Sequence, residues 1–141
     1  MCTPCIHLRS ANNGTFRGPI QDGIPSFVEI NLEAALSRVS LPTSVKINRR
    51  FIIGGASVYR DTLALEGSTP TASVVDRILL TRILSPEFED CDVFFPEFRN
   101  TPGWSQASHK ALEAWVGFEV AKGIQTENGV EYEFQMWIRD V

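Results

Sequence analysis

The hydrophobic pattern of the chain is most regular near its C-terminal end. Apolar residues occupy every second position of one long stretch: Val130, Tyr132, Phe134, Met136 and Ile138. A period of two predicts a β-strand that buries one of its faces. Asn128-Gly129 stands directly before this stretch and favours a tight turn. We therefore expect a hairpin whose first arm lies within residues 118–125.

Two further apolar runs predict buried strands. The first is Phe51–Ile53, which ends at Gly54, and the second is Val75–Ile83. Both are rich in residues that fit a pleated, buried surface. Pro25–Ile30 predicts a shorter extended stretch.

Helical spacing of apolar residues predicts three helices. The first has Asn31 as its N-cap, and Pro42 ends it. The segments concerned are 32–39, 56 to about 65, and 105–116. By contrast, residues 1–23 show little periodicity and are interpreted as a disordered lead-in, apart from a short strand near Cys5–Leu8.

Gly54-Gly55 joins the first predicted strand to the helix that starts at Ala56. Paired glycines permit backbone angles closed to other residues and let another molecule approach the main chain. The start of the following helix presents free N–H groups, which suits a phosphate. A tight turn without any ligand explains the two glycines equally well, because the full dinucleotide fingerprint has three glycines and a later acid.

Composition narrows the class of protein. The chain has 141 residues, 43% of them hydrophobic and 21% charged, which predicts one ordinary globular domain. A net charge of −4 argues against a nucleic-acid or anionic-membrane surface. No apolar run approaches the roughly 20 residues of a membrane span, and residues 1–10 lack the pattern of a signal peptide. We therefore expect a cytoplasmic protein with no nucleic-acid or membrane partner.

Three cysteines are too few for a disulfide framework. Cys2 and Cys5 have the CxxC spacing of a metal or redox pair, but a zinc site needs two more ligands and no second pair exists. We expect no metal site and interpret the pair as part of a frayed end. The acidic residues of 85–96 are interpreted as a solvated turn, and His109 as a surface or capping residue.

Five stretches together resemble dihydrofolate reductase, especially its fungal members. Their order and spacing agree from about Ser26 to Val141, whereas residues 1–25 are unmatched. The stretches are Phe51–Tyr59, Val75–Ile83, Asp92–Pro96, Trp104-Ser105 and Glu127–Phe134. The resemblance implies that residues 26–141 are the C-terminal part of such a domain.

The resemblance implies an α/β fold with a twisted, mostly parallel sheet flanked by helices and a C-terminal antiparallel hairpin, here with the N-terminal strands missing. It also implies NADPH-dependent reduction of dihydrofolate to tetrahydrofolate, a step of one-carbon metabolism, and a cis peptide between the paired glycines. The cofactor-binding residues implied are Gly54, Gly55, Ala56, Ser57, Val58 and Tyr59. Those implied for the substrate are Ile53, through its carbonyl, together with Tyr59 and Thr81.

Some of the family's functional parts have no match in this chain. These are the mid-sheet first strand, the mobile active-site loop, the acid that orders the proton donor and the helix that grips the folate. Asp22, Glu29 and Glu33 stand in the wrong context to replace the acid. We therefore expect no catalytic residue here, an inactive isolated chain, and strands with unpaired edges open to self-association.

Two alternatives to an active reductase remain open. One is a non-catalytic remnant, or a fragment that binds nucleotide without turnover, produced by truncation or by an alternative start. The other is the reductase domain of riboflavin biosynthesis, which has a related sheet and glycine turn. The pattern of Tyr132–Trp137 and the segment Asp92–Pro96 speak against the second alternative.

Overall fold

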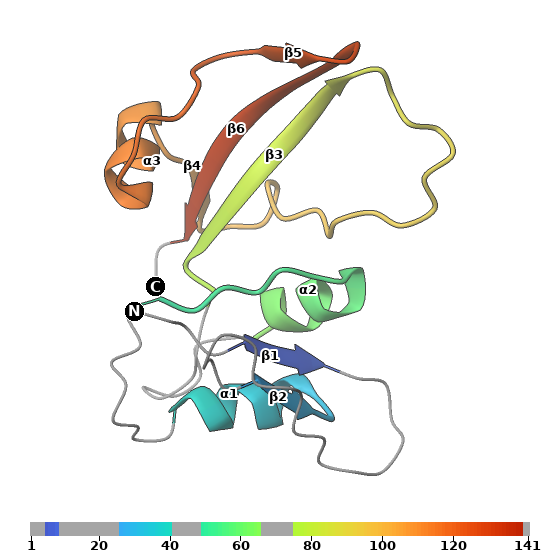
Figure 1. Cartoon of the computed structure of the whole chain (residues 1–141), viewed down its shortest axis with the longest axis vertical. Coiled ribbons are helices and arrows are strands. Elements are labelled where there is room, and N and C mark those ends of the chain that lie inside the picture. Colours follow the sequence, from blue (N-terminus) through green and yellow to red (C-terminus); the bar gives the residue numbers. More distant parts are fainter. Residues whose placement is uncertain (1–4, 9–25, 41–48, 66–74, 140–141) are drawn as a thin grey trace. The chain divides into compact units, whose positions relative to one another are not determined.

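The computed structural model describes residues 5–8, 26–40, 49–65 and 75–139. The chain divides into two compact units, residues 1–62 and 63–141. Cys2, Asp22 and Pro42, for which the sequence makes predictions, lie outside the described residues. The helices and strands of both units are labelled in Figure 1.

The first unit contains a parallel strand pair covered by a helix. Strands β1 (Cys5–Leu8) and β2 (Ser26–Glu29) pair in parallel, and α1 (Leu32–Ser40) packs against both. The predicted cap of α1 is confirmed, since Asn31 Oδ1 accepts a hydrogen bond of 2.8 Å from the backbone N–H of Ala34. These elements confirm the short strand, the extended stretch and the first helix predicted from the sequence.

An arginine holds α1 against β2. Arg38 forms an ion pair with Glu29, and its guanidinium lies 4.6 Å from the centre of the Phe27 ring. A guanidinium can make both contacts at once because its face is apolar while its edge donates hydrogen bonds. Glu29 is therefore committed to a structural contact.

The strand predicted at Phe51–Ile53 is wrong, whereas the helix after it is confirmed. Residues 51–53 belong to no strand, and the side chains of Phe51 and Ile53 are 58% and 91% exposed. An apolar β-branched run favours a strand only where a neighbouring strand pairs with it, and no described strand pairs with this one. Helix α2 spans Ala56–Leu63.

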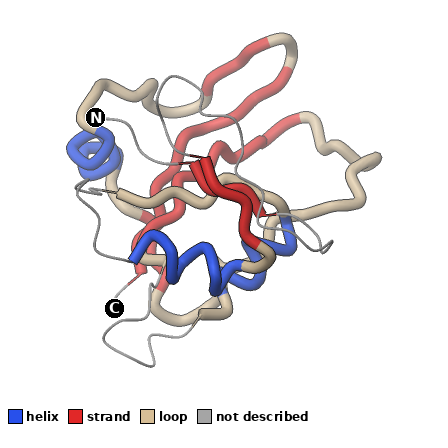
Figure 2. The backbone as a smooth tube through the Cα atoms, turned by 60° about the horizontal axis from the view of Figure 1, so that its bottom comes forward, coloured by secondary structure: helices blue, strands red, loops and turns tan. Residues whose placement is uncertain are grey.

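The second unit is an antiparallel sheet with one helix. Its strands are β3 (Arg77–Ser85), β4 (Trp104–Gln106), β5 (Gln125–Glu127) and β6 (Val130–Arg139), and its helix is α3 (His109–Val116). Strand β6 pairs with all three other strands, in the described residues, and runs beside β3 over most of its length (Figures 1 and 2). The predicted third helix is thus shorter than expected, because residues 104–106 form β4.

The predicted hairpin is confirmed, although its first arm starts only at Gln125, the last residue of the expected range. Asn128 and Gly129 both have positive φ, 50° and 79°, as the two central residues of a type I′ turn require. This turn twists in the same sense as the strands it joins, so β5 and β6 pair directly. The turn dipeptide was therefore sufficient to place the hairpin.

The mostly parallel sheet expected from the resemblance is not confirmed. The fold is α/β with three helices among the described residues, but the four-stranded sheet is entirely antiparallel, and β1 with β2 is the parallel pair. The expected parallel pairing depended on a strand at Phe51–Ile53. Because that segment is not a strand in the structure, it supplies no parallel neighbour.

Both faces of β6 are covered at its centre. Phe98 is buried and makes edge-to-face contacts with Phe95, Trp104 and Trp137 at centroid distances of 5.8, 5.5 and 5.4 Å. On the opposite face Met136 is buried, and α3 packs against β6. The alternation in the sequence predicted burial of one face, and that prediction is wrong at the centre of the strand, where the adjacent residues Gln135 and Met136 are both buried.

Buried Gln135 is satisfied by its neighbours along the same face of the strand. Its side-chain oxygen accepts a 2.8 Å hydrogen bond from Trp137 Nε1, and its side-chain nitrogen donates to Glu133. Residues two apart on a strand share a face, so three consecutive members of that face form one chain of hydrogen bonds. The polar group is thereby buried without the cost of an unmade hydrogen bond.

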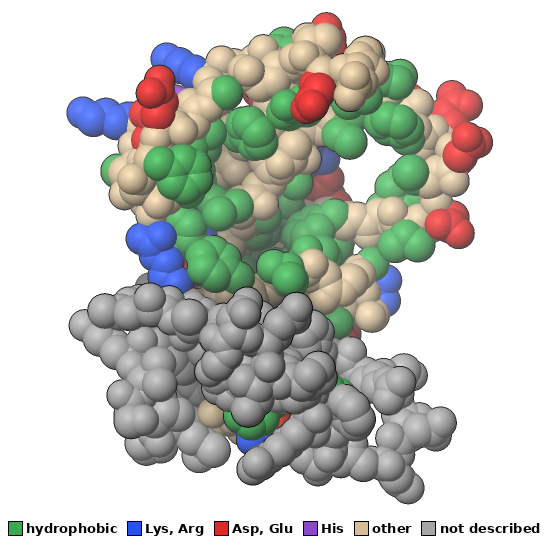
Figure 3. Space-filling view, in the orientation of Figure 1, with side chains coloured by type: hydrophobic (Ala, Val, Ile, Leu, Met, Phe, Trp, Pro, Cys, Tyr) green, Lys and Arg blue, Asp and Glu red, His purple; other side chains and the backbone are tan. Residues whose placement is uncertain are grey.

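Strand β3 is more exposed than its apolar sequence predicts. Ile78 is its buried residue, whereas Leu79 and Ile83 are 45% and 51% exposed. Apolar side chains are visible at many places on the face of the second unit that Figure 3 shows.

Candidate functional site

The glycine turn stands directly at the start of α2. Gly54 has φ of +134°, in the region open to glycine, and the Gly54–Gly55 peptide is cis, as the resemblance implies. The first hydrogen bond of the helix runs from the N–H of Tyr59 to the carbonyl of Gly55, at 3.0 Å. The N–H groups of residues 56–58 precede this bond and are therefore left over at the helix start.

The side chain of Tyr59 returns to the glycine turn. A Cβ placed on Gly54 would lie 3.9 Å from the Tyr59 hydroxyl oxygen. Side chains of a helix tilt toward its N-terminus, so a tyrosine in the first turn reaches the residues just before the helix. The structure therefore brings together six predicted residues, Gly54, Gly55, Ala56, Ser57, Val58 and Tyr59.

The glycine turn is open at Gly55, whereas Thr62, near the other end of α2, is buried. A Cβ on Gly55 would meet no atom within 4 Å, and Ser57 is exposed. Thr62 is buried, and its hydroxyl donates a 2.5 Å hydrogen bond to the carbonyl of Val58. Ile53 precedes the turn with its side chain in solvent. Among the described residues, no side chain stands within 4 Å of a Cβ on Gly55, so a ligand can approach the backbone there.

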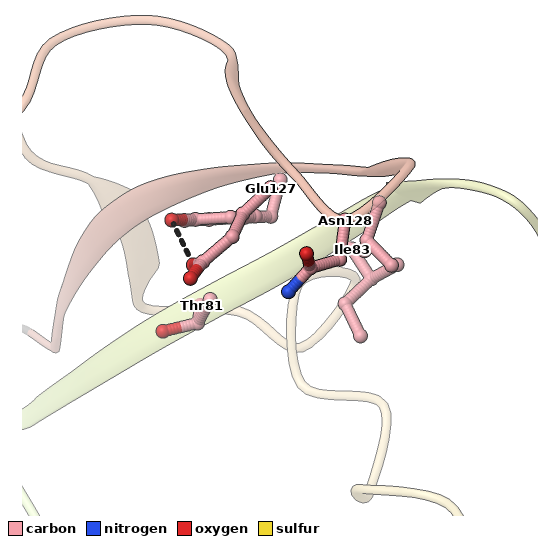
Figure 4. A pocket seen from close by; sticks show the side chains of 6 residues that line it. Thr81, Ile83, Glu127 and Asn128 are labelled. Carbon is pink, nitrogen blue, oxygen red and sulfur yellow. Dashed lines mark hydrogen bonds between the residues drawn. The ribbon is translucent and has the colours of Figure 1, made fainter.

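Thr81 belongs to the second unit, where it lines a shallow open pocket of about 400 Å³. The pocket lies between β3 and the hairpin, and its lining residues are Thr81, Ile83, Glu127, Asn128, Val130 and Tyr132 (Figure 4). The Tyr132 hydroxyl donates to Glu127 at 3.4 Å. Sequence reasoning missed Glu127, Asn128 and Tyr132. The predicted hairpin turn could have indicated Glu127 and Asn128. Tyr132 lies opposite Ile83 only through the register of β3 with β6, which the sequence did not predict.

The carboxylates considered as replacements for the acid do not form a proton-donating site among the described residues. Glu29 is paired with Arg38, and Glu33 is exposed in the first turn of α1. His109 opens α3, and its Nε2 lies 3.4 Å from Glu113 Oε1. Such contacts are typical of structural residues on helices and at the surface.

The described part of the chain holds no group of three metal-binding side chains, and none of its helices combines the length and apolar character needed to span a bilayer. Cys91 is an exposed free thiol.

Three known proteins that are similar to this chain in sequence carry the same name. The chain is 41% identical over 105 residues to the dihydrofolate reductase of Pneumocystis carinii, a match that spans 70% of this chain and 46% of that protein. It is 36% identical over 132 residues to the dihydrofolate reductase of Cryptococcus neoformans var. neoformans, spanning 80% of this chain and 56% of that one. The mouse dihydrofolate reductase is 30% identical over 112 residues, 79% of this chain and 51% of the mouse protein. No protein-family model matches.

The chain is thus a homologue of reductases. Its homologues are dihydrofolate reductases of fungi and a mammal, as the sequence resemblance indicated. The chain spans about half the length of the curated relatives it matches.

Proposed function

We propose that the chain serves the NADPH-dependent reduction of dihydrofolate to tetrahydrofolate, in the cytoplasm, as the part of the enzyme that holds the cofactor. The observation that carries this proposal is the Tyr59 hydroxyl beside the Gly54 turn, at the start of α2. Homology to dihydrofolate reductases supports the same assignment.

The residues at the turn fit a dinucleotide. Its diphosphate is an anion, and the left-over N–H groups of residues 56–58 form the positive end of a helix. Gly55 has open space beside it, so the backbone is accessible to a bulky ligand. These properties belong to Gly54, Gly55, Ala56, Ser57 and Val58, the residues that we propose for the cofactor.

The reduction divides between the cofactor and the chain. When bound, NADPH supplies the hydride. The chain holds the reacting rings in place. This positioning alone can lower a reaction barrier by several kcal/mol. In the first unit we assign this positioning to the hydroxyl of Tyr59 and the carbonyl of Ile53. In the second unit Thr81 is a separate proposal for a substrate-binding residue, as the resemblance implies.

Proton delivery is the step for which this chain shows no candidate among its described residues. Glu29 is engaged by Arg38, and Glu33 is on an exposed helix turn. We therefore propose that the 141-residue chain by itself binds NADPH but does not turn over dihydrofolate, which is the behaviour of a nucleotide-binding fragment.

The test combines NADPH binding, followed by fluorescence, with NADPH oxidation in the presence of dihydrofolate. We expect saturable binding without oxidation. Tyr59→Phe is expected to weaken binding severalfold through loss of one hydroxyl, whereas Tyr132→Phe, which alters a tyrosine of the second unit, serves as the matched control.

Two results would count against the proposal. Oxidation that persists after removal of contaminating enzyme would show that a residue of this chain delivers the proton. A folded chain with no NADPH binding would contradict the assignment of the glycine turn.

A further inference from the structure

Asn128 and Gly129 form the tip of the β5–β6 hairpin. Both residues are exposed, and a Cβ placed on Gly129 would meet no atom within 4 Å. A backbone nitrogen can attack the amide carbon of the asparagine before it, and glycine hinders this attack least because it has no Cβ beside its nitrogen. The tip therefore presents an asparagine amide, an unhindered backbone nitrogen and access to water.

The hairpin does not use either of these two groups. Strand β5 pairs with β6 up to Glu127 opposite Val130, so the ladder closes around the turn and leaves the N–H of Gly129 outside it. Among the described residues, no hydrogen bond involves this N–H or the side-chain amide of Asn128. Figure 4 shows the Asn128 side chain apart from the hydrogen bond between Tyr132 and Glu127.

We propose that Asn128 is a site of spontaneous deamidation in the folded chain, which converts it to aspartate and isoaspartate. The Gly129 nitrogen bonds to Asn128 Cγ, the bond from Cγ to Nδ2 breaks, and ammonia leaves with the proton of the Gly129 N–H. Water then opens the cyclic imide. Cleavage at Cγ gives aspartate, whereas cleavage at the main-chain carbonyl gives isoaspartate, in which the chain continues through Cβ and Cγ.

The other asparagines in the described part of the chain lack this combination. Asn31 is followed by Leu32, and its Oδ1 accepts the capping hydrogen bond of α1. Asn100 is exposed, but the N–H of Thr101 after it donates to the carbonyl of Phe98 at 2.9 Å. The branched Thr101 side chain also crowds that nitrogen. We expect both asparagines to keep their amides.

The two products differ in their effect on the hairpin. Aspartate keeps the turn, because Asp-Gly fits the same type I′ geometry as Asn-Gly. Isoaspartate adds one carbon to the main chain at residue 128, so Glu127 and Val130 no longer close the ladder in register. The hydrogen bond from Tyr132 to Glu127 links the two arms at this end and is loosened with them. Deamidation thus changes the wall of the pocket beside Thr81.

The test is incubation of the folded 141-residue chain at neutral pH. It is followed by digestion in acid, where cyclisation is slow, and by mass spectrometry of the peptide that carries residue 128. We expect ammonia release and both products at this residue, with isoaspartate also detected by an isoaspartyl carboxyl methyltransferase. The chain's other Asn-Gly pair, Asn13-Gly14, lies outside the described residues, and Asn13→Gln removes its contribution to the ammonia released.

Gly129→Ala places a Cβ beside the attacking nitrogen. We expect it to slow conversion of Asn128 roughly tenfold, which corresponds to about 1.4 kcal/mol in the barrier. Alanine also strains the turn, since the φ of Gly129 is 79°. Gly123→Ala is the matched control, because Gly123 has a similar φ of 76° and equally open space but follows no asparagine. Thermal melting of both variants verifies that they fold.

Hydrogen exchange measures the structural consequence. The aged chain should exchange faster at residues 125–132 than the fresh chain, whereas Asn128→Asp should match the fresh chain. Equal exchange in all three would overturn the effect on the hairpin. The proposed site itself is overturned if Asn128 keeps its amide in the folded chain, if it converts only in a urea-unfolded chain, or if aspartate forms without isoaspartate.

Discussion

Gly54 has a backbone conformation that glycine adopts and residues with a side chain resist. Its φ of +134° makes Gly54→Ala strained whatever space surrounds it. We expect this change to lower the free energy of unfolding of the first unit by about 1–3 kcal/mol and to weaken NADPH binding.

Gly55→Ala is the matched control for the effect on stability, because a Cβ at Gly55 meets nothing within 4 Å. Chemical denaturation of the two variants measures the difference. Equal effects of the two substitutions would contradict a special conformational requirement at Gly54.

Arg99 lowers the pKa of Glu97 to about 2 from the usual 4.5, chiefly through hydrogen bonds to its carboxylate. The guanidinium holds both carboxylate oxygens, with Nε 2.9 Å from Oε1 and Nη2 2.5 Å from Oε2. A lowered pKa in the folded state stabilises the fold above the usual pKa of 4.5, and this stabilisation is lost as the pH falls toward 2. The pair is exposed, so solvent screening keeps its contribution small.

Arg99→Gln is therefore expected to raise the pKa of Glu97 toward its usual value. Carbon-detected NMR titration of the Glu97 carboxyl checks this, with Arg82→Gln as the control that leaves Glu97 unchanged. An unaltered pKa in Arg99→Gln would show that Arg99 is not the cause.

At the scale of an element, Ser108 begins α3. Its hydroxyl accepts a 3.2 Å hydrogen bond from the N–H of Ala111, one of the donors left over in the first turn. Ser108→Ala should cost about 1 kcal/mol of unfolding free energy. Ser105→Ala, in the exposed part of β4, should cost much less, and urea denaturation of both variants makes the comparison.

Elements that are determined by residues close together in the sequence were predictable. Asn31 as a cap, the helix after Gly55 and the Asn128-Gly129 turn each depend on residues a few positions apart. The glycine turn and Tyr59 are local in the same way, so most of the candidate cofactor site could be assigned without a structure.

Features that depend on distant neighbours could not be predicted. Phe51–Ile53 has the composition of a strand but no described strand beside it. The burial of Gln135 follows from Phe98 and its aromatic neighbours, which cover a face that alternation assigns to solvent. The register of β3 with β6 determines which residues line the pocket beside Thr81. This register cannot be predicted from the sequence.

At the scale of the whole molecule, the two compact units should respond separately to damage in one core. Phe98→Ala removes a buried ring that contacts three other aromatic residues, and such changes cost about 3–5 kcal/mol. We expect hydrogen exchange to accelerate across the sheet of residues 77–139 and to change little in residues 26–62.

Phe118→Ala is the control for that experiment, because Phe118 is 67% exposed. Acceleration of equal size in both units would contradict their independence, and an effect of Phe118→Ala as large as that of Phe98→Ala would contradict the assignment of the core.

Strand β6 is the shared neighbour of β3, β4 and β5. During synthesis on the ribosome, those three strands emerge before it and have no partner in this sheet until residues 130–139 leave the exit tunnel. Pairing between segments far apart in the chain is slow, and waiting strands with exposed leucine and isoleucine side chains are ligands for chaperones. The synthesis of β6 therefore sets the time at which these four strands can pair.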